Sequence, residues 1–398
     1  MVSVCFYFQV HQPYRLRKYT VFDIGQNSDY FFHEKNKEII EKIANKCYLP
    51  ANAVLHELLR KHPSFKVSFS FSGVVLEQFK KYAPGVLESF RALVNTGRVE
   101  ILSETYYHSL SFLYSKEEFR QQIAMHRRMV QELFGYTPTA FRNTELIYNN
   151  ELAKIVEGMG YKAILAEGAD HILGWRSPHY LYRPTACNSI ALLLKSYKLS
   201  DDIAFRFSNK GWADYPLDAQ KYAQWINAIN GNGYVVNLFM DYETFGEHQW
   251  QDTGIFSFLG ALPGELLKHP HNSFVTPSEA AAKFPISGEL DVHHLMSWAD
   301  VERDLSAWLG NSMQHSALSK IYEMEPAIKK TGDEALLSDW RKLQTSDHFY
   351  YMCTKWFSDG DVHKYFNPYD SPYDSFIAFM NILNDMRKRT EIKPEIRT

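Results

Sequence analysis

The chain has 398 residues, of which 45% are hydrophobic and 22% are charged, and its formal net charge is -3. This composition is typical of a globular protein with a large core, and it excludes a disordered chain, which would be poorer in apolar residues and richer in net charge. A net charge near zero also excludes the basic excess of proteins that bind nucleic acid or anionic membrane surfaces. We therefore expect neither partner.

The cysteines and the first residues predict a cytoplasmic protein. The four cysteines lie far apart and form no CxxC pair, so neither a zinc knuckle nor a redox pair is expected, and a reducing compartment is the default. The opening MVSVCFYFQV lacks a basic region and a cleavage site, and Gln9 and His11 interrupt it, which predicts a strand and not a signal peptide. No run reaches the roughly 20 apolar residues of a membrane span.

Short apolar runs alternate with longer amphipathic segments through the first two thirds of the chain, which is typical of βαβ units. The predicted parallel strands are 2–10, 65–71, 98–102, 139–142, 162–166, 202–207 and 234–240. The predicted crossover helices include 38–63, 82–97, 115–135 and 149–160, several of them closed by glycine or proline. The runs 179–184 and 189–197 predict a β-hairpin inserted in a loop.

The pattern changes after residue 285, where helices are predicted over 301–330, 334–357 and 371–389. About seven parallel strands, each followed by a helix, close most naturally into a barrel. The fold class is therefore α/β, a barrel followed by a helical region.

Acidic, amide and imidazole side chains follow most of the predicted strands. The segments are HQPYR after the first strand, SETYYHSL after the third, FRNTEL after the fourth, AEGADH after the fifth and DYETFGEH after the seventh. Because the carboxyl ends of barrel strands share one rim, these side chains should converge on one pocket. Such a pocket suits a polyhydroxylated ligand and acid-base chemistry, and aromatic rings, 15% of the residues, can stack on sugars.

Five segments in this order resemble the conserved regions of family 57 of the glycoside hydrolases, especially its α-amylase branch. They are FQVHQPYR, TGRVEILSETYYHSL, FRNTELIYNN, LFMDYETFGEH and HHLMSWADVERDLSAWLGN, and they span essentially the whole chain. The resemblance implies an irregular (β/α)7 TIM-like barrel at residues 1–284 and a helical region at 285–398 that contributes to the active cleft. It also implies retaining action on α-1,4-glucans, with Glu145 as nucleophile and Asp241 as acid/base.

Retaining hydrolysis needs two carboxyl groups about 5 Å apart, one that attacks the anomeric carbon and one that protonates the leaving oxygen. If each segment is considered without the others, Glu145 could be a helix cap beside Thr144, and Asp241 could cap the segment after its strand. Glu243 is the alternative proton donor. Arg142 is a predicted hydrogen-bond donor that would keep the pKa of Glu145 low.

Further residues near the predicted rim are expected to bind the substrate: His11, Gln12, Glu100, Trp175, Glu243, Trp298 and Asp300. Trp298 could stack on a glucose ring. His11 could instead tie its strand end together, Glu100 could be a structural carboxylate within its strand, and Trp175 could be a core side chain rather than part of a lid. Glu104 and His108 are additional candidates.

Several functions fit this reading. The main one is an α-amylase-like hydrolase acting on an α-glucan or a maltooligosaccharide; 4-α-glucanotransferase activity, branching activity and non-catalytic glucan binding are alternatives. A metal-dependent deacetylase would use ligands such as His11, Asp241, His248, His293 and His294, but the sequence has no HxxxH or HExxH pair. We therefore expect no metal and no cofactor. The oligomeric state is not predicted.

Overall fold

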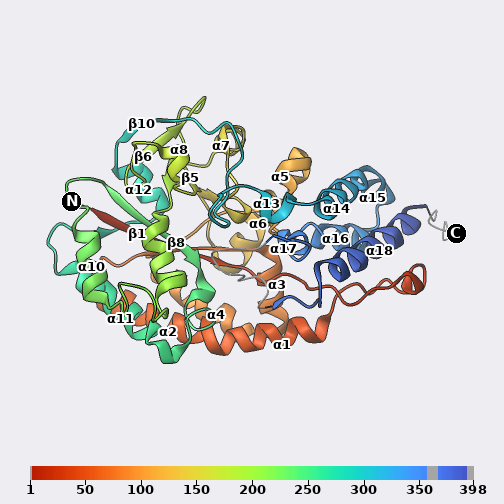
Figure 1. The fold of residues 1–398 in the computed structure, drawn as a ribbon, viewed down its shortest axis with the longest axis horizontal. Helices are drawn as coiled ribbons and strands as arrows, with labels where there is room; N and C mark the ends of the chain where they lie inside the picture. The colour runs from red at the N-terminus through yellow and green to blue at the C-terminus, as the bar shows by residue number, and fades with distance from the viewer. Residues whose placement is uncertain (1, 356–365, 392–398) are drawn as a thin grey trace.

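The computed structural model describes residues 2–355 and 366–391, and strand β1 (Ser3–Val10) lies at the centre of one half of its barrel. β1 pairs in parallel with β2 (Val67–Phe71) on one side and with β8 (Val235–Asp241) on the other, and β2 pairs with β3 (Val99–Ile101). Every residue of β1 and β2 is buried, as expected of parallel strands with both faces covered. Figure 1 shows these strands crossing the molecule between the helices.

The other half of the barrel consists of β4 (Ala140–Arg142), β5 (Ala163–Ala166) and β7 (Ala191–Leu194), which pair in parallel. A bridge between Ser103 and Phe141 joins β3 to β4. Between β7 and β8, Asn237 spans the seam: its Nδ2 donates to the Leu194 carbonyl at 2.8 Å, and its own carbonyl accepts from the Ser196 N–H at 2.9 Å. The predicted (β/α)7 barrel is confirmed.

One predicted strand is wrong. Residues 202–206 form a π-helix, η4 (Asp202–Arg206), that continues α9 (Tyr197–Asp201), and Phe207 follows in a turn. Arg206 Nε donates to Asp202 at 2.7 Å across one helical turn. The sixth barrel strand is β7, which the sequence indicated only as half of a hairpin. That hairpin is present, because β6 (Leu181–Pro184) pairs antiparallel with β7. β6 also pairs with β10 (Ile286–Leu290), a strand that the sequence did not indicate.

Helices cover the outside of the barrel, and the four predicted crossover segments are helical over most of their length. The helices of the barrel are α1 (His33–Ile43), α2 (Leu49–Lys61), α3 (Gly73–Tyr82), α4 (Pro84–Val94), α6 (Lys116–Phe134), α7 (Asn150–Gly158), α10 (Ala219–Asn227), α11 (Ile255–Leu267) and α12 (Pro277–Lys283). α6 shows how the sequence sets the bounds. Ser115 caps its start by accepting the Glu118 N–H, and Gly135, at a φ of +62°, ends it.

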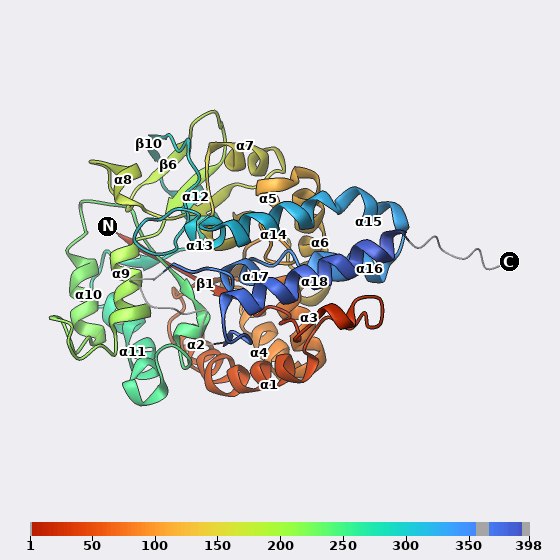
Figure 2. The same cartoon turned by 45° about the vertical axis from the view of Figure 1, so that its right-hand side comes forward.

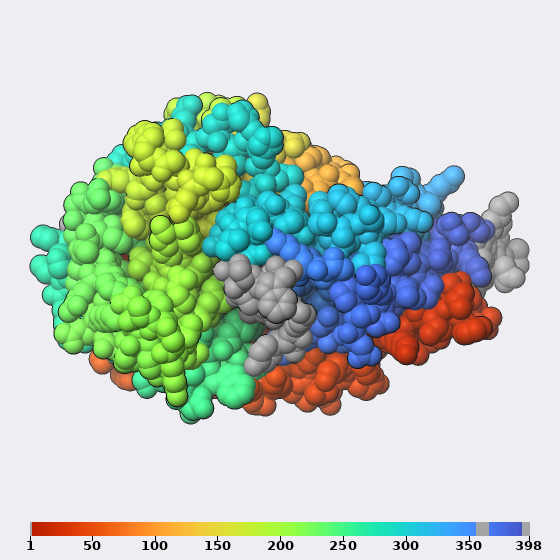
Figure 3. Space-filling model, viewed as in Figure 1, coloured from red at the N-terminus to blue at the C-terminus, as the bar shows by residue number. Residues whose placement is uncertain are grey.

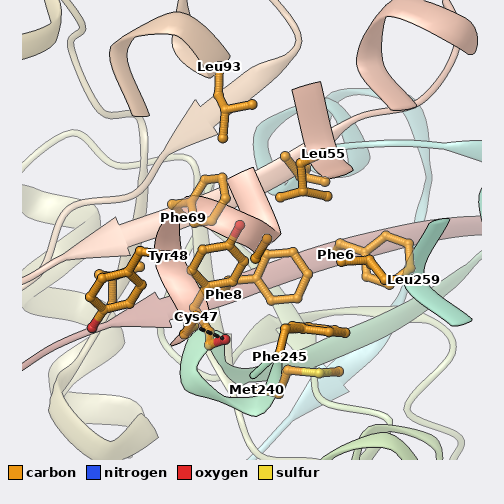
Figure 4. Close-up of a cluster of buried hydrophobic side chains, with 14 of the residues drawn as sticks. Phe6, Phe8, Cys47, Tyr48, Leu55, Phe69, Leu93, Met240, Phe245 and Leu259 are labelled. Carbon is orange, nitrogen blue, oxygen red and sulfur yellow. Dashed lines mark hydrogen bonds between the residues drawn. The ribbon is translucent and has the colours of Figure 1, made fainter. Parts of the chain in front are cut away.

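Aromatic rings fill the space between the first half of the barrel and its helices. In Figure 4, Phe6, Phe8 and Phe69 from β1 and β2 lie among Tyr48 and Leu55 from the helices. The centroids of the Phe8 and Phe69 rings are 5.6 Å apart. Burying such a side chain contributes about 1.5–3 kcal/mol, so this cluster holds β1 and its neighbours firmly in place beneath the rim.

The C-terminal part of the described chain is helical, as predicted. It contains α13 (Ser306–Leu309), α14 (Ser312–Glu323), α15 (Glu325–Thr331), α16 (Glu334–Lys342), α17 (Ser346–Tyr350) and α18 (Pro372–Glu391). The predicted helix 301–330 is broken, because residues 301–305 form turns before α13. The predicted helix 334–357 is also interrupted, after Lys342, and its end lies outside the described residues.

The N-terminal segment 16–32 packs against α18 at the end of the molecule away from the barrel (Figures 2 and 3). Tyr30 OH donates to Asp385 at 2.5 Å, and Asn381 Nδ2 donates to the Tyr19 carbonyl at 3.2 Å. The helical region is therefore fastened to residues that follow the first barrel strand. The division at residues 284/285 stays a prediction; β10, just beyond it, still belongs to a sheet of the barrel.

Among residues 2–355 and 366–391, no helix is both long and apolar enough to span a membrane.

Candidate active site

One pocket collects side chains from the strand ends of the barrel and from the helical region. Its lining is Gln9, His11, Gln12, Pro13, Arg15, His108, Glu145, Asp241, Glu243, His248, Trp298, Asp347, Tyr351 and Phe366. Both predicted catalytic acids and four of the predicted substrate-binding residues are in this set. The convergence follows from the barrel, since parallel strands deliver their carboxyl ends to one rim.

Glu145 lies just beyond β4, in the short 3-10 helix η3 (Thr144–Leu146), and is 3% exposed. Its φ is +57°, a left-handed value that costs free energy in a non-glycine residue and is characteristic of functional sites. Ser346 Oγ donates to Glu145 Oε1 at 2.8 Å, and Trp298 Nε1 donates to Oε2 at 2.9 Å. Both oxygens are therefore oriented by donors from the helical region, which favours the ionised carboxylate.

Asp241 is the last residue of β8, and Glu243 follows in the 3-10 helix η5 (Tyr242–Thr244). Gln12 Nε2 donates to Glu243 Oε1 at 3.2 Å, and the Tyr48 hydroxyl also donates to this oxygen. Burial, and next the negative charge of Asp241, raise the pKa of Glu243 to about 8. The end of β8 thus brings two acids together, at least one of which holds a proton near neutral pH.

The rings of His11 and His108 stack beside Glu145, with their centroids 4.0 Å apart. His11, after β1, has Nδ1 2.7 Å from Ser72 Oγ and Nε2 2.9 Å from Asp347 Oδ2. Burial, and next the charge of His108, lower the pKa of His11. The alternative prediction for His11 was that it ties its strand end together, and its contacts with Ser72 and Asp347 are of this kind; the residue also lines the pocket.

Glu104 and His108 occupy the loop after β3. Glu104 is buried, accepts from Gln9 Nε2 at 3.0 Å, and lies 2.8 Å from His108 Nδ1. The other ring nitrogen of His108 lies 3.4 Å from Glu145 Oε1. These two residues therefore connect the end of β3 with the end of β4.

Arg142 was predicted to donate to Glu145, and this prediction is wrong. Its side chain is fully buried, and its three nitrogens have no hydrogen-bond partner among residues 2–355 and 366–391. Instead its guanidinium lies 4.9 Å from the centre of the Trp298 ring, and Lys195 Nζ lies 5.5 Å from the same ring. Cations over the face of an indole are attracted to it, so Arg142 helps to hold the side chain that donates to Glu145.

Three predicted substrate-binding residues do not line the pocket. Glu100, within β3, accepts from the Ser278 N–H at 3.0 Å, and burial raises its pKa. Trp175 is 89% exposed in the loop after α8 (Asp170–Leu173). Asp300 is buried and pairs with Lys355 at 3.0 Å. Substrate contact for Glu100, Trp175 and Asp300 stays a prediction that the pocket geometry does not support.

Several residues of the site were not anticipated from the sequence. Asp347, in α17, lines the pocket, whereas Ser346, the first residue of α17, and Tyr48, in the helical segment between α1 and α2, donate hydrogen bonds to its acids. Arg15 Nη2 donates to Gln12 Oε1 at 2.8 Å and so orients the amide that reaches Glu243. The contacts of α17 with His11, which follows β1, and with Glu145, which follows β4, arise from tertiary packing, so the local sequence of α17 gives no sign of them.

Within the described parts of the chain, no group of three or more His, Cys, Asp or Glu side chains is placed to hold a metal ion.

Residues 5–293 match the model of the glycosyl hydrolase family 57. A relative from Methanocaldococcus jannaschii, named "Putative alpha-amylase", is 46% identical over 398 residues, which covers 96% of this chain and 83% of the relative. A 4-alpha-glucanotransferase from Thermococcus litoralis is 27% identical over 146 residues, 37% of this chain and 21% of that relative.

Solved structures are similar to this chain along most of its length. The crystal structure of 4-alpha-glucanotransferase from Thermococcus litoralis matches with a TM-score of 0.72 at 18% identity, and the match covers 99% of this chain and 60% of that one. This chain therefore spans less than two thirds of that protein. The alpha-amylase AmyC from Thermotoga maritima matches with a TM-score of 0.62 at 13% identity, covering 99% and 98% of the two chains. At these identities the likeness concerns the fold.

Proposed function

The chain belongs to the glycosyl hydrolase family 57, and from this premise we propose that it acts on α-1,4-glucans with retention of configuration, as an α-amylase-like hydrolase. The observation that carries the proposal is the shared pocket, in which the Glu145 carboxylate accepts from Ser346 and Trp298 while Asp241 faces the same space from the end of β8. The glucan substrate is supported by the relatives, which include proteins named alpha-amylase and 4-alpha-glucanotransferase.

In the first step, an ionised Glu145 oxygen forms a bond to the anomeric carbon as the glycosidic C–O bond breaks, and the leaving oxygen takes the proton of Asp241. This step yields a covalent glycosyl-enzyme and an ionised Asp241. The hydrogen bonds from Ser346 and Trp298 place the attacking carboxylate before the substrate arrives, which reduces the entropic cost of reaching the reactive geometry.

In the second step, Asp241 removes a proton from an incoming hydroxyl, whose oxygen bonds to the anomeric carbon as the bond to Glu145 breaks. Water gives hydrolysis, whereas a sugar hydroxyl gives transfer. Retention follows because the two displacements each invert the anomeric carbon. His11, Gln12 and Trp298 border the same space and are the proposed substrate-binding residues.

The nucleophile is tested by Glu145→Gln, which keeps the shape of the side chain and removes its charge. We expect the variant to release reducing ends from maltoheptaose at least about 10³-fold more slowly than the parent. Glu151→Gln, an exposed position in α7 whose side chain pairs with Lys116, is the matched control and should retain full activity. Turnover by Glu145→Gln at the parental rate would refute the assignment.

Product analysis by chromatography after incubation with maltoheptaose separates the two acceptors. Only shorter products are expected for the proposed hydrolase, and products longer than maltoheptaose would show transfer. If the parent binds the oligosaccharide but yields no products, glucan binding without catalysis is the better description.

A further inference from the structure

We propose that His108 is held as an imidazolium by Glu104 and that this buried cation keeps Glu145 ionised and oriented for attack. His108 is a positioning residue, and Glu104 acts through it. The inference deepens the proposed function and rests on its assignment of Glu145 as the nucleophile. No part of it needs the identity of the glucan or of the acceptor.

The positions of the two ring nitrogens support the cationic form. Nδ1 lies 2.8 Å from Glu104 Oε2, and Nε2 lies 3.4 Å from Glu145 Oε1. A neutral imidazole has one N–H donor and one acceptor, whereas an imidazolium has two donors. Because both nitrogens face carboxylate oxygens, only the imidazolium presents an N–H to each of them.

The charges around His108 favour the same state. Burial alone would lower the pKa of His108, but the hydrogen bonds and charges of Glu104 and Glu145 outweigh it and raise this pKa to about 9. Burial would likewise raise the pKa of Glu104, yet His108, and after it Arg142, lower it to about 2. The stacked ring of His11 has a lowered pKa, so the two adjacent imidazoles do not both carry a charge near neutral pH.

The backbone of His108 supports Glu145 by a second route. His108 has a φ of +50°, and its N–H donates to the Thr105 carbonyl at 3.0 Å. Its own carbonyl accepts the Ser346 N–H at 2.9 Å, and the Ser346 hydroxyl donates to Glu145 Oε1. The left-handed backbone at this position therefore anchors one donor to Glu145, while the side chain supplies the charge beside the same oxygen.

The chemical consequence concerns the acidic side of the pH dependence. Retaining attack needs an ionised nucleophile, and a cation within about 4–6 Å lowers a carboxyl pKa by about 1–3 units. Without the imidazolium, Glu145 would take up its proton at a higher pH, and the enzyme would lose activity there. Glu104 determines whether His108 keeps its second proton, because Glu104 lies closer to the imidazole, at 2.8 Å, than Glu145 does, at 3.4 Å.

The pH dependence of kcat/KM for maltoheptaose tests the inference with His108→Gln and Glu104→Gln. In both variants the acidic limb should move to higher pH by about 1–3 units. His179→Gln is the control, because the side chain of this half-buried imidazole contacts Ser196 Oγ, an uncharged partner, at 3.2 Å. An acidic limb that stays within about 0.3 units of the parent in folded His108→Gln would overturn the proposal.

A measurement on the unmodified protein covers the case in which these variants do not fold. In nitrogen-15 spectra of histidine rings at pH 8, one ring should keep the signals of an imidazolium, since unperturbed histidine is neutral there. Spectra in which every histidine ring is neutral at pH 8 would overturn the proposal. The readout does not depend on turnover, so it separates this inference from the proposed function: active Glu145→Gln would refute the nucleophile while leaving the His108 cation in place.

Discussion

Replacing Glu243 by glutamine should remove a large part of the pH dependence of stability. The carboxyl is buried and its pKa is raised to about 8, so at pH 7 the folded protein holds it neutral by roughly ten to one. In the unfolded chain the group ionises near its ordinary pKa of about 4.3. The contribution of Glu243 to stability is therefore fully present below that pH, and it is lost progressively as the pH rises through about 8.

The size of the effect follows from the two pKa values. Between pH 5 and pH 8 the linkage removes on the order of 3 kcal/mol from the free energy of unfolding of the parent, and the amide of Glu243→Gln does not titrate. The free energy of unfolding of Glu243→Gln, relative to that of the parent, should therefore increase by about 3 kcal/mol between pH 5 and pH 8. Urea unfolding followed by tryptophan fluorescence at pH 5 and pH 8 measures the difference.

A buried but cation-paired carboxylate provides the contrast. Glu247, four residues further on, lies 2.8 Å from Lys42 and 3.4 Å from Lys46. Glu247→Gln should destabilise the protein at both pH values, because it removes the anionic partner of two lysines. A Glu243→Gln variant whose stability relative to the parent is the same at pH 5 and pH 8 would refute a neutral Glu243.

The same variant distinguishes Asp241 from Glu243 as the acid/base. Asp241→Asn should lower kcat/KM for maltoheptaose by about 10²–10⁴-fold, the usual contribution of a positioned proton donor. The loss should be much smaller with an aryl maltoside whose phenolate leaves without protonation. Glu243→Gln mimics the neutral carboxyl and should stay within about tenfold of the parent on both substrates. If Glu243→Gln instead shows the pattern expected of Asp241→Asn, the two roles are reversed.

Three further substitutions test how the site and its scaffold are held. Trp298→Phe keeps a ring but loses the N–H that donates to Glu145. Because a hydrogen bond to a charged group contributes about 1.5–3 kcal/mol, the acidic limb of the pH dependence of kcat/KM should move to higher pH by about one to two units. Asn237→Ala leaves the Leu194 carbonyl without its donor at the barrel seam and should cost about 1–3 kcal/mol in urea unfolding, whereas an unchanged midpoint would mean that the seam does not depend on it. Gly246→Ala adds a Cβ at a φ of +112° only 2.0 Å from a backbone oxygen, so its melting temperature should fall by several degrees.

The barrel could be predicted because its strands are buried on both faces. Continuous apolar runs such as 2–10 and 234–240 are distinctive, and their length separates them from helices. The sixth strand was misplaced because 202–207 is a short run that contains Ile and two Phe, although it also carries Asp202 and Arg206, whereas 191–194 is entirely apolar. The hairpin prediction identified the pairing of β7 with β6 and missed its second neighbour, β5, because sequence patterns indicate local pairing better than pairing across a crossover.

Whether a polar side chain lies within a strand or beyond its end separates the site predictions that the structure supports from those that it does not. Glu100 lies within β3, and its side chain bonds to the start of α12, whereas Glu104 and His108 lie beyond the strand and reach the rim. The contact of His11 with Asp347 joins residues 336 positions apart in the chain. The sequence around Asp347, in the helical region, gives no local signal that its partner is His11, which follows β1.

The acids of this site differ in protonation because their nearest charged neighbours differ. Glu104 faces an imidazolium, which lowers its pKa to about 2, whereas Glu243 faces Asp241, which adds to burial and raises its pKa to about 8. Both carboxyls are buried, so burial alone would have raised both. A retaining mechanism needs an ionised carboxyl and a protonated one in the same pocket. The cation at the ends of β3 and β4 lies beside Glu145, and the pair of acids at the end of β8 holds at least one proton near neutral pH, so the pocket contains a carboxyl of each kind.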